Sequence, residues 1–133
     1  MNKGIYISLR FVHPTDNVHA IVERMGLEIK RSWRAGDLRK TPDGMPLLGT
    51  YSQSYIVCDV LNEREGSLSE IISLAIKKIQ PFHEELINFV ENNGKCSFYI
   101  GLDKNNFEGA SLDWPLLLEL GKLKISLEID REF

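Results

Sequence analysis

The stretch from Lys30 to Lys40 carries the side chains with the clearest potential for recognition chemistry. It holds five basic residues and one acidic residue, a balance of +4 that leaves −7 for the rest of a chain whose formal charge is −3. Guanidinium groups bind carboxylate and phosphate oxygens in pairs, so this cluster can hold an acidic protein surface, a phosphate or a nucleic-acid backbone. The candidate contact residues are Arg31, Trp33, Arg34, Asp37 and Arg39.

The same stretch also has a purely structural interpretation. Runs of surface charge are more often simply solvated. In that case Trp33 anchors the core, Arg34 and Asp37 hold the local loop in place, and the other charges face solvent. The two interpretations therefore differ in whether Trp33 is exposed or buried.

The acidic net charge disfavours nucleic acid as a partner. Non-specific nucleic-acid binding needs an extended basic face and usually a high pI, whereas the pI here is about 5.6. Aromatic residues on predicted strands can stack unpaired bases, as in single-stranded RNA readers. The segment Ser97–Ile100 lacks the basic and glycine residues of such a motif, so we expect Tyr51, Tyr55, Phe98 and Tyr99 to pack in the core.

Residue types for catalysis or metal binding are present but not in functional spacing. The histidines are isolated, at positions 13, 19 and 83, and metal sites need several converging ligands. Cys58 and Cys96 each lie inside a strand pattern, which predicts buried, reduced and unreactive thiols. No phosphate-binding glycine loop or nucleophile elbow is found in the sequence, so we expect no catalytic residue, metal or cofactor.

Two hydrophobic periodicities indicate the elements that position these side chains. Alternating apolar residues predict strands at about 5–11, 27–33, 50–60, 96–102 and 123–129. Apolar residues spaced by three and four predict a short helix, a long helix interrupted at Gln80-Pro81, and a second short helix. The predicted helix caps are Asp16, Ser67 and Asp113, and the predicted stops are Gly26, Gly94 and Gly121. Glycines and prolines make 34–49 an irregular loop in this prediction.

The order of these elements predicts an α+β fold. The first six match the split βαβ arrangement of a ferredoxin-like βαββαβ sandwich, with helices mainly on one sheet face, followed by a C-terminal helix and a fifth strand. A chain of 133 residues buries about two-thirds of its unfolded surface, which is enough for one core, so residues 1–133 are predicted to form a single domain.

The sequence also predicts the cellular compartment of the protein. The first residues lack the features of a signal peptide, and the longest apolar run, Trp114–Leu118, is far too short to span a membrane. We therefore expect a cytoplasmic protein that does not insert into membranes. A homodimer is possible but is not indicated by the sequence.

At four places the chain resembles a bacterial family, the domain of unknown function 4279 family. These are the capped helix that ends in Met25-Gly26-Leu27, the turn Arg31-Ser-Trp-Arg-Ala-Gly-Asp37, the long helix after Ser67, and the closing Leu127-Glu-Ile-Asp130. One difference is Thr50-Tyr51-Ser52, where such proteins often hold a tryptophan. The resemblance spans nearly the whole chain and implies a single bacterial domain, and it implies no reaction.

Two functional hypotheses remain open at this point. The leading one is a non-catalytic protein-interaction module, of immunity or accessory type, that binds one protein partner through Arg31, Trp33, Arg34 and Arg39. The alternative is an enzyme or sensor that binds a small anionic ligand near the basic loop 30–49, with Arg31 and Arg34 on the anion and Asp37 orienting them.

Overall fold

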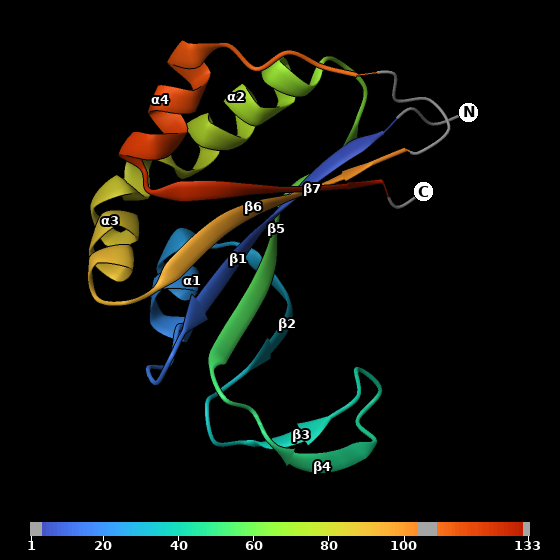
Figure 1. Ribbon diagram of the computed structural model, residues 1–133, viewed down its shortest axis with the longest axis vertical. Coiled ribbons are helices and arrows are strands. Elements are labelled where there is room, and N and C mark those ends of the chain that lie inside the picture. Colours follow the sequence, from blue (N-terminus) through green and yellow to red (C-terminus); the bar gives the residue numbers. More distant parts are fainter. Residues whose placement is uncertain (1–3, 104–108, 132–133) are drawn as a thin grey trace.

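A five-stranded sheet organises the molecule (Figure 1). The computed structural model describes residues 4–103 and 109–131, apart from the side chains of residues 63 and 64. From edge to edge the strands are β2 (Glu28–Trp33), β5 (Ser54–Arg64), β1 (Ile5–His13), β6 (Lys95–Leu102) and β7 (Ile125–Arg131). The α+β class is confirmed.

Strand direction follows from the order of elements along the chain. The neighbours β2, β5, β1 and β6 are all antiparallel, whereas β6 and β7 are parallel. The two strands of each βαβ unit are thus separated by a strand of the other unit. The fifth strand joins the β6 edge because the helix before it carries the chain back along the sheet.

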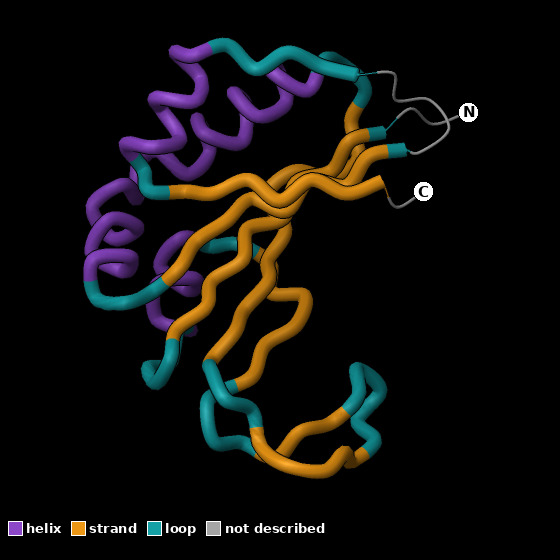
Figure 2. Tube along the Cα trace, in the orientation of Figure 1, coloured by secondary structure: helices purple, strands orange, loops and turns teal. Residues whose placement is uncertain are grey.

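Helices cover one face of this sheet and leave the other without a helix (Figures 1 and 2). They are α1 (His19–Met25), α2 (Leu68–Ile79), the 3₁₀ turn η1 (Gln80–Phe82), α3 (His83–Glu91) and α4 (Trp114–Lys122). Ser67 caps α2 as predicted, with its hydroxyl accepting the Glu70 backbone N–H at 3.2 Å. The predicted interruption at Gln80-Pro81 is confirmed as η1.

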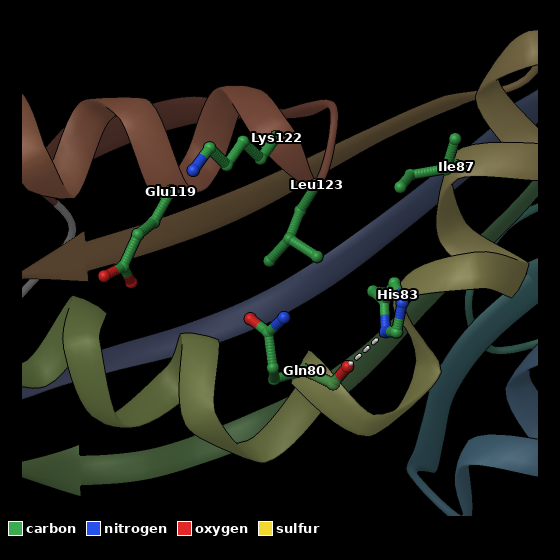
Figure 3. Close-up of a pocket in the computed structure, with 6 residues that line it drawn as sticks. All are labelled: Gln80, His83, Ile87, Glu119, Lys122 and Leu123. Carbon is green, nitrogen blue, oxygen red and sulfur yellow. Dashed lines mark hydrogen bonds between the residues drawn. The ribbon is translucent and has the colours of Figure 1, made fainter.

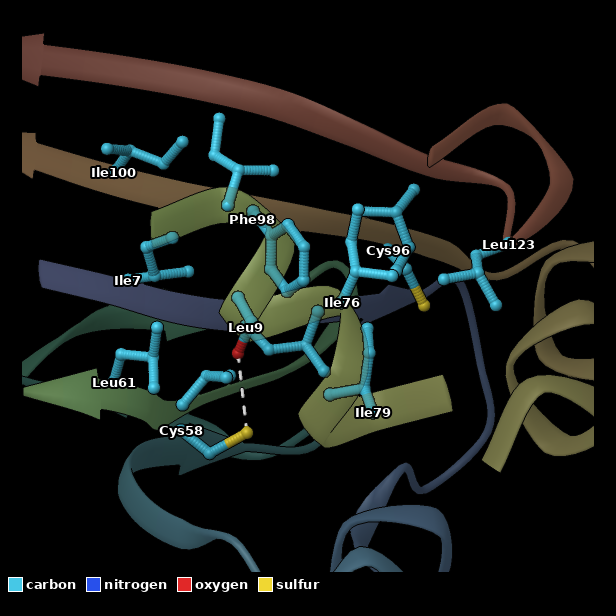
Figure 4. Close-up of a cluster of buried hydrophobic side chains, with 14 of the residues drawn as sticks. Ile7, Leu9, Cys58, Leu61, Ile76, Ile79, Cys96, Phe98, Ile100 and Leu123 are labelled. Atoms are coloured by element: carbon cyan, nitrogen blue, oxygen red, sulfur yellow. Dashed lines mark hydrogen bonds between the residues drawn. The ribbon is translucent and has the colours of Figure 1, made fainter. Parts of the chain in front are cut away.

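The core lies between the helices and the covered sheet face. Ile7, Leu9 and Phe11 of β1 are fully buried, and their neighbours Tyr6, Ser8 and Arg10 point to the other face, as the period of two requires. Figure 4 shows this cluster, in which Leu9 and Phe98 pack beside Ile76 and Ile79. Cys58 and Cys96 are buried in it, as predicted.

Several predicted helix ends are wrong by a few residues. The first helix begins at His19, and Asn17 rather than Asp16 accepts the His19 N–H, because the Asp16 N–H is engaged by His13 Nδ1. Gly121 lies inside α4, and the left-handed residue after that helix is Lys124, with φ of 57°.

Gly94 was predicted to stop a helix, but the structure requires glycine there for another reason. The helix α3 ends at Glu91, and Asn93 takes the left-handed conformation with φ of 74°. A Cβ added at Gly94 would lie 2.4 Å from Cε2 of Phe89, so this position requires glycine for close approach and not for its φ.

The largest correction concerns residues 34–49, which form an antiparallel hairpin and not an irregular loop. Its strands are β3 (Leu38–Lys40) and β4 (Pro46–Thr50). Asp43-Gly44 makes the connecting turn, in which the Thr41 N–H donates to Met45 O at 2.8 Å. The strand predicted at 50–60 is consequently divided, because β4 ends at Thr50 and β5 starts at Ser54. The glycines and prolines that predicted a loop shape the turns of this hairpin.

Candidate interaction surface

The hairpin forms an arm that projects from the sheet. We define the arm as residues 34–51, which leave the end of β2 and return to the start of β5. Figure 1 shows it beyond the lower end of the sheet, reaching toward the side that carries no helix. None of its residues belongs to the hydrophobic core cluster.

Three aromatic rings join the arm to the sheet. Trp33 at the end of β2 stacks on Tyr51 and on Tyr55, in both cases with ring centroids 4.4 Å apart. Tyr51 also holds β3, because its hydroxyl donates to Lys40 O at 3.0 Å and its N–H donates to Asp37 O at 2.9 Å. Ser54, fully buried, accepts the Ala35 N–H at 2.9 Å. The arm therefore has a fixed base.

Trp33 fits neither of the two sequence interpretations. It is partly buried, yet its burial comes from the aromatic stack at the base of the arm and not from the core. The Arg31 guanidinium lies 4.9 Å from the centre of its ring. The structure therefore brings the candidate residues Arg31 and Trp33 together.

The other candidate residues lie along the arm, apart from this pair. Arg34 and Asp37 close the turn at its base, where the Asp37 N–H donates to Arg34 O at 3.1 Å and Gly36 supplies a φ of 88°. Arg39 lies on β3 and donates to Leu48 O at 3.3 Å. Arg34, Asp37 and Arg39 are exposed, and none makes an ion pair within the described residues.

Apolar side chains on the arm face solvent. Leu48 is 92% exposed, Leu38 is 77% exposed and Met45 is 60% exposed. Sequence reasoning missed these residues because it treated 34–49 as a loop without a partner strand. Pro42-Asp43-Gly44 was the available signal, and it indicates the turn of a hairpin but not its strands.

The uncovered sheet face contains a polar and aromatic network that sequence reasoning also missed. The Arg10 guanidinium lies 3.9 Å from the centre of the Tyr99 ring, and its Nη1 donates to Glu128 at 3.3 Å. Ser97 donates to the same carboxylate, and the Tyr99 hydroxyl donates to Asp130 at 3.0 Å. These residues come from β1, β6 and β7, which the register places side by side.

The predicted burial of the strand aromatics is wrong for Tyr51, Tyr55 and Tyr99. Phe98 is in the core, but each of these tyrosines is half-buried on the uncovered side. Tyr55 has a raised pKa, chiefly because burial disfavours the phenolate, with a smaller contribution in the same direction from Glu128. Arg10 and Arg31 act in the opposite direction on the same pKa.

A surface hollow lies on the other side of the molecule, where η1 and α3 meet the end of α4 (Figure 3). Its volume is about 460 Å³, and it is lined by Gln80, His83, Ile87, Glu119, Lys122 and Leu123. The His83 Nδ1 lies 3.1 Å from Gln80 O. The polar side chains around it are exposed, and no described residue joins them into a network like that of Arg10.

A family model described as "Domain of unknown function (DUF4279)" matches residues 3–133. The chain belongs to this family. No curated protein and no solved structure matches the chain. The DUF4279 assignment agrees with the resemblance found in the sequence, and it leaves the activity to be inferred from the surface.

The two cysteines of this DUF4279 chain are buried free thiols. Burial raises the pKa of the Cys58 thiol to about 12 and also raises the pKa of Cys96, so both thiols are protonated at neutral pH. Among the described helices, none is long and apolar enough to cross a membrane.

Proposed function

We propose that this DUF4279 chain is a non-catalytic protein-interaction module, of immunity or accessory type, which binds one protein partner through the arm. The observation that carries the proposal is the exposure of Leu38, Met45 and Leu48 on a hairpin that stands clear of the core. Apolar side chains gathered on a projecting element mark interaction sites in soluble proteins. The arm contributes nothing to the core, so another reason is needed for its apolar residues.

The exposed positive charges of the arm indicate that the surface of the partner is acidic. Arg34, Arg39 and Lys40 are exposed and make no ion pair within the described residues, whereas the chain as a whole is acidic. Complementary charge speeds encounter and selects among partners. A partner that presents acidic side chains around an apolar pocket fits this arrangement.

The aromatic base supports the same proposal energetically. A lone two-stranded hairpin is only marginally stable in water. The stack of Trp33 with Tyr51 and Tyr55 holds the arm in one orientation before binding. The arm therefore loses less conformational entropy when a partner binds.

Site-specific photocrosslinking tests this proposal. A benzophenone amino acid replaces Leu48 in one variant and Leu117, an exposed residue of α4, in the control variant. In native lysate we expect the Leu48 variant alone to form one crosslinked species with another protein. Adding R39E and K40E to that variant should reduce its yield at least tenfold, since removing close complementary charges costs about 1.5 kcal/mol or more.

Two results would contradict the proposal. One is a crosslinking pattern at position 48 that equals the pattern at position 117, or that survives charge reversal. The other is a product made of two copies of this chain, which would make the arm a self-association element instead.

A further inference from the structure

Two arginines face the same uncovered side of the sheet on one register row. Arg31 of β2 pairs with Val57 of β5, and Val57 pairs with Arg10 of β1. Alternation places the Arg10 side chain away from the core, and the β-bulge between Ile29 and Arg31 turns Arg31 to the same face. Arg31 makes no ion pair within the described residues, and Arg10 has one, to Glu128 at 3.3 Å. The row therefore holds more positive than negative charge.

Arg10 is held in place but its hydrogen bonding is incomplete. Its guanidinium stacks on Tyr99 at 3.9 Å, which fixes the plane of the group. Its Nε is buried and has no hydrogen-bond partner within the described residues. An unsatisfied buried donor costs free energy, and such groups are few in native proteins. Because Nε itself is buried, an anion meets the exposed part of the guanidinium, and the Arg10 side chain is 30% exposed.

Tyr55 adds a hydroxyl beside the two arginines. It lies two residues before Val57 on β5, so it shares their face, and its ring is fixed by the stack on Trp33. Its hydroxyl makes no hydrogen bond within the described residues. Arg10 and Arg31 both favour the phenolate of Tyr55 electrostatically, so both guanidinium groups act on this point of the surface.

We propose that Arg10, Arg31 and Tyr55 form a binding site for one carboxylate group, which belongs either to a small organic acid or to an acidic side chain of a protein. Two guanidinium groups and one hydroxyl supply donors to both carboxylate oxygens. Glu128 beside Arg10 repels a second negative charge, so the site favours a carboxylate over a doubly charged phosphate. This inference does not depend on the proposed partner of the arm.

The aromatic neighbours indicate what is attached to the carboxylate. Trp33 and Tyr55 form an apolar wall next to the arginines, so an acid with a flat or apolar group buries more surface there than acetate does. Benzoate is therefore a suitable probe for a free acid. A blocked peptide, acetyl-Phe-Glu-Phe-amide, is the probe for a side chain because glutamate is its only carboxylate.

Backbone amide NMR titrations at constant ionic strength test the site. We expect benzoate or the blocked peptide to shift the amide signals of Arg10, Arg31 and Val57 in a saturable way, with benzamide and inorganic phosphate binding at least about tenfold more weakly. Binding by benzoate identifies a free acid as the ligand class, and binding by the peptide alone identifies an acidic side chain. No saturable shift with either probe, or tighter binding of phosphate, overturns the proposal.

Variants separate this site from the rest of the surface. R31Q leaves the Arg10–Glu128 pair intact and should weaken binding at least about tenfold, whereas Y55F should weaken it about fivefold. R24Q changes an exposed arginine of α1 and should bind like the wild type. If R31Q and Y55F, with unchanged melting temperatures, also bind like the wild type, the assignment is wrong.

Discussion

The atoms next to each glycine determine whether the fold tolerates a side chain at that position. A Cβ at Gly94 would meet the ring and the carbonyl oxygen of Phe89 at 2.4–2.5 Å, and backbone cannot move as a side-chain tip can. A Cβ at Gly121 would meet nothing within 4 Å. Both positions were predicted as helix stops. Gly94 has no room for a side chain, whereas Gly121 has room for one.

Alanine substitution at these positions should therefore change stability in opposite directions. We expect G94A to lower the free energy of unfolding by about 1–3 kcal/mol, because a methyl group is forced into packed atoms. G121A should raise it by about 0.5–1 kcal/mol, because alanine loses less backbone entropy in the helix α4. Urea unfolding measures both values. Equal effects would show that close approach to Phe89 does not explain Gly94.

The buried thiols predict a pH dependence of stability. Burial, with a smaller effect of Asp59, raises the pKa of Cys58 from its ordinary 9.0 to about 12. Above pH 9 the unfolded chain releases this proton while the folded chain keeps it, so stability falls as pH rises from about 9 to about 12. Each thiol should cost about 1 kcal/mol between pH 9 and 10.

Urea unfolding at pH 8, 9 and 10 measures this loss. The double variant C58A/C96A is the control, and it should lose less stability over the same pH interval than the wild type. Identical pH dependence in the two proteins would mean that the thiols are not the groups that titrate.

At the scale of elements, the arm depends on a stack of three rings. Each stacked aromatic pair is worth about 0.5–1.5 kcal/mol, and Trp33 takes part in two. W33A should therefore increase the fraction of molecules with a detached arm, and trypsin should cleave after Arg39 and Lys40 about tenfold faster.

The matched control for this experiment is W114A. Trp114 is 74% exposed on α4 and does not contact the arm's aromatic base. Its loss should leave the cleavage rate of the arm unchanged. A W33A protein as resistant to trypsin as the wild type would show that other contacts hold the arm.

The elements that were predictable from sequence are those with a strong period. Alternation in β1 and the capping box at Ser67 each point to one structure because local and tertiary preferences agree. The strands of the arm were not predictable, because they are short, all their positions are exposed and a glycine interrupts the second one. Arg10 was missed for a different reason: its partners Tyr99 and Glu128 are distant in sequence and are brought together by the sheet.

At the scale of the whole molecule, the arm is an addition to a sheet that is complete without it. Trp33 and Tyr55 are paired across β2 and β5, so the next residues, Arg34 at the start of the arm and Ser54 of β5, stand where the closing pair of a short hairpin would stand. A two-residue turn is enough to join strands in that position.

Replacing residues 35–53 by Asn-Gly should therefore give a folded protein. We expect cooperative urea unfolding, with a loss of about 2 kcal/mol or less from the missing Tyr51 stack and the missing partner of Ser54. L9A, which opens a cavity in the core, should cost about 2–5 kcal/mol by comparison. Loss of cooperative unfolding in the armless protein would mean that the arm belongs to the folding unit.

The central place of β1 also affects how the chain acquires its structure during synthesis. Among the described strands it is synthesised before the others, yet its two neighbours are Ser54–Arg64 and Lys95–Leu102. At about 5–20 residues per second, the ribosome takes several seconds to release them. Until β5 emerges, Ile5, Ile7, Leu9 and Phe11 have no neighbouring strand, and the other edge of β1 stays unpaired until β6 follows, so the nascent chain is most prone to aggregation before β6 has emerged.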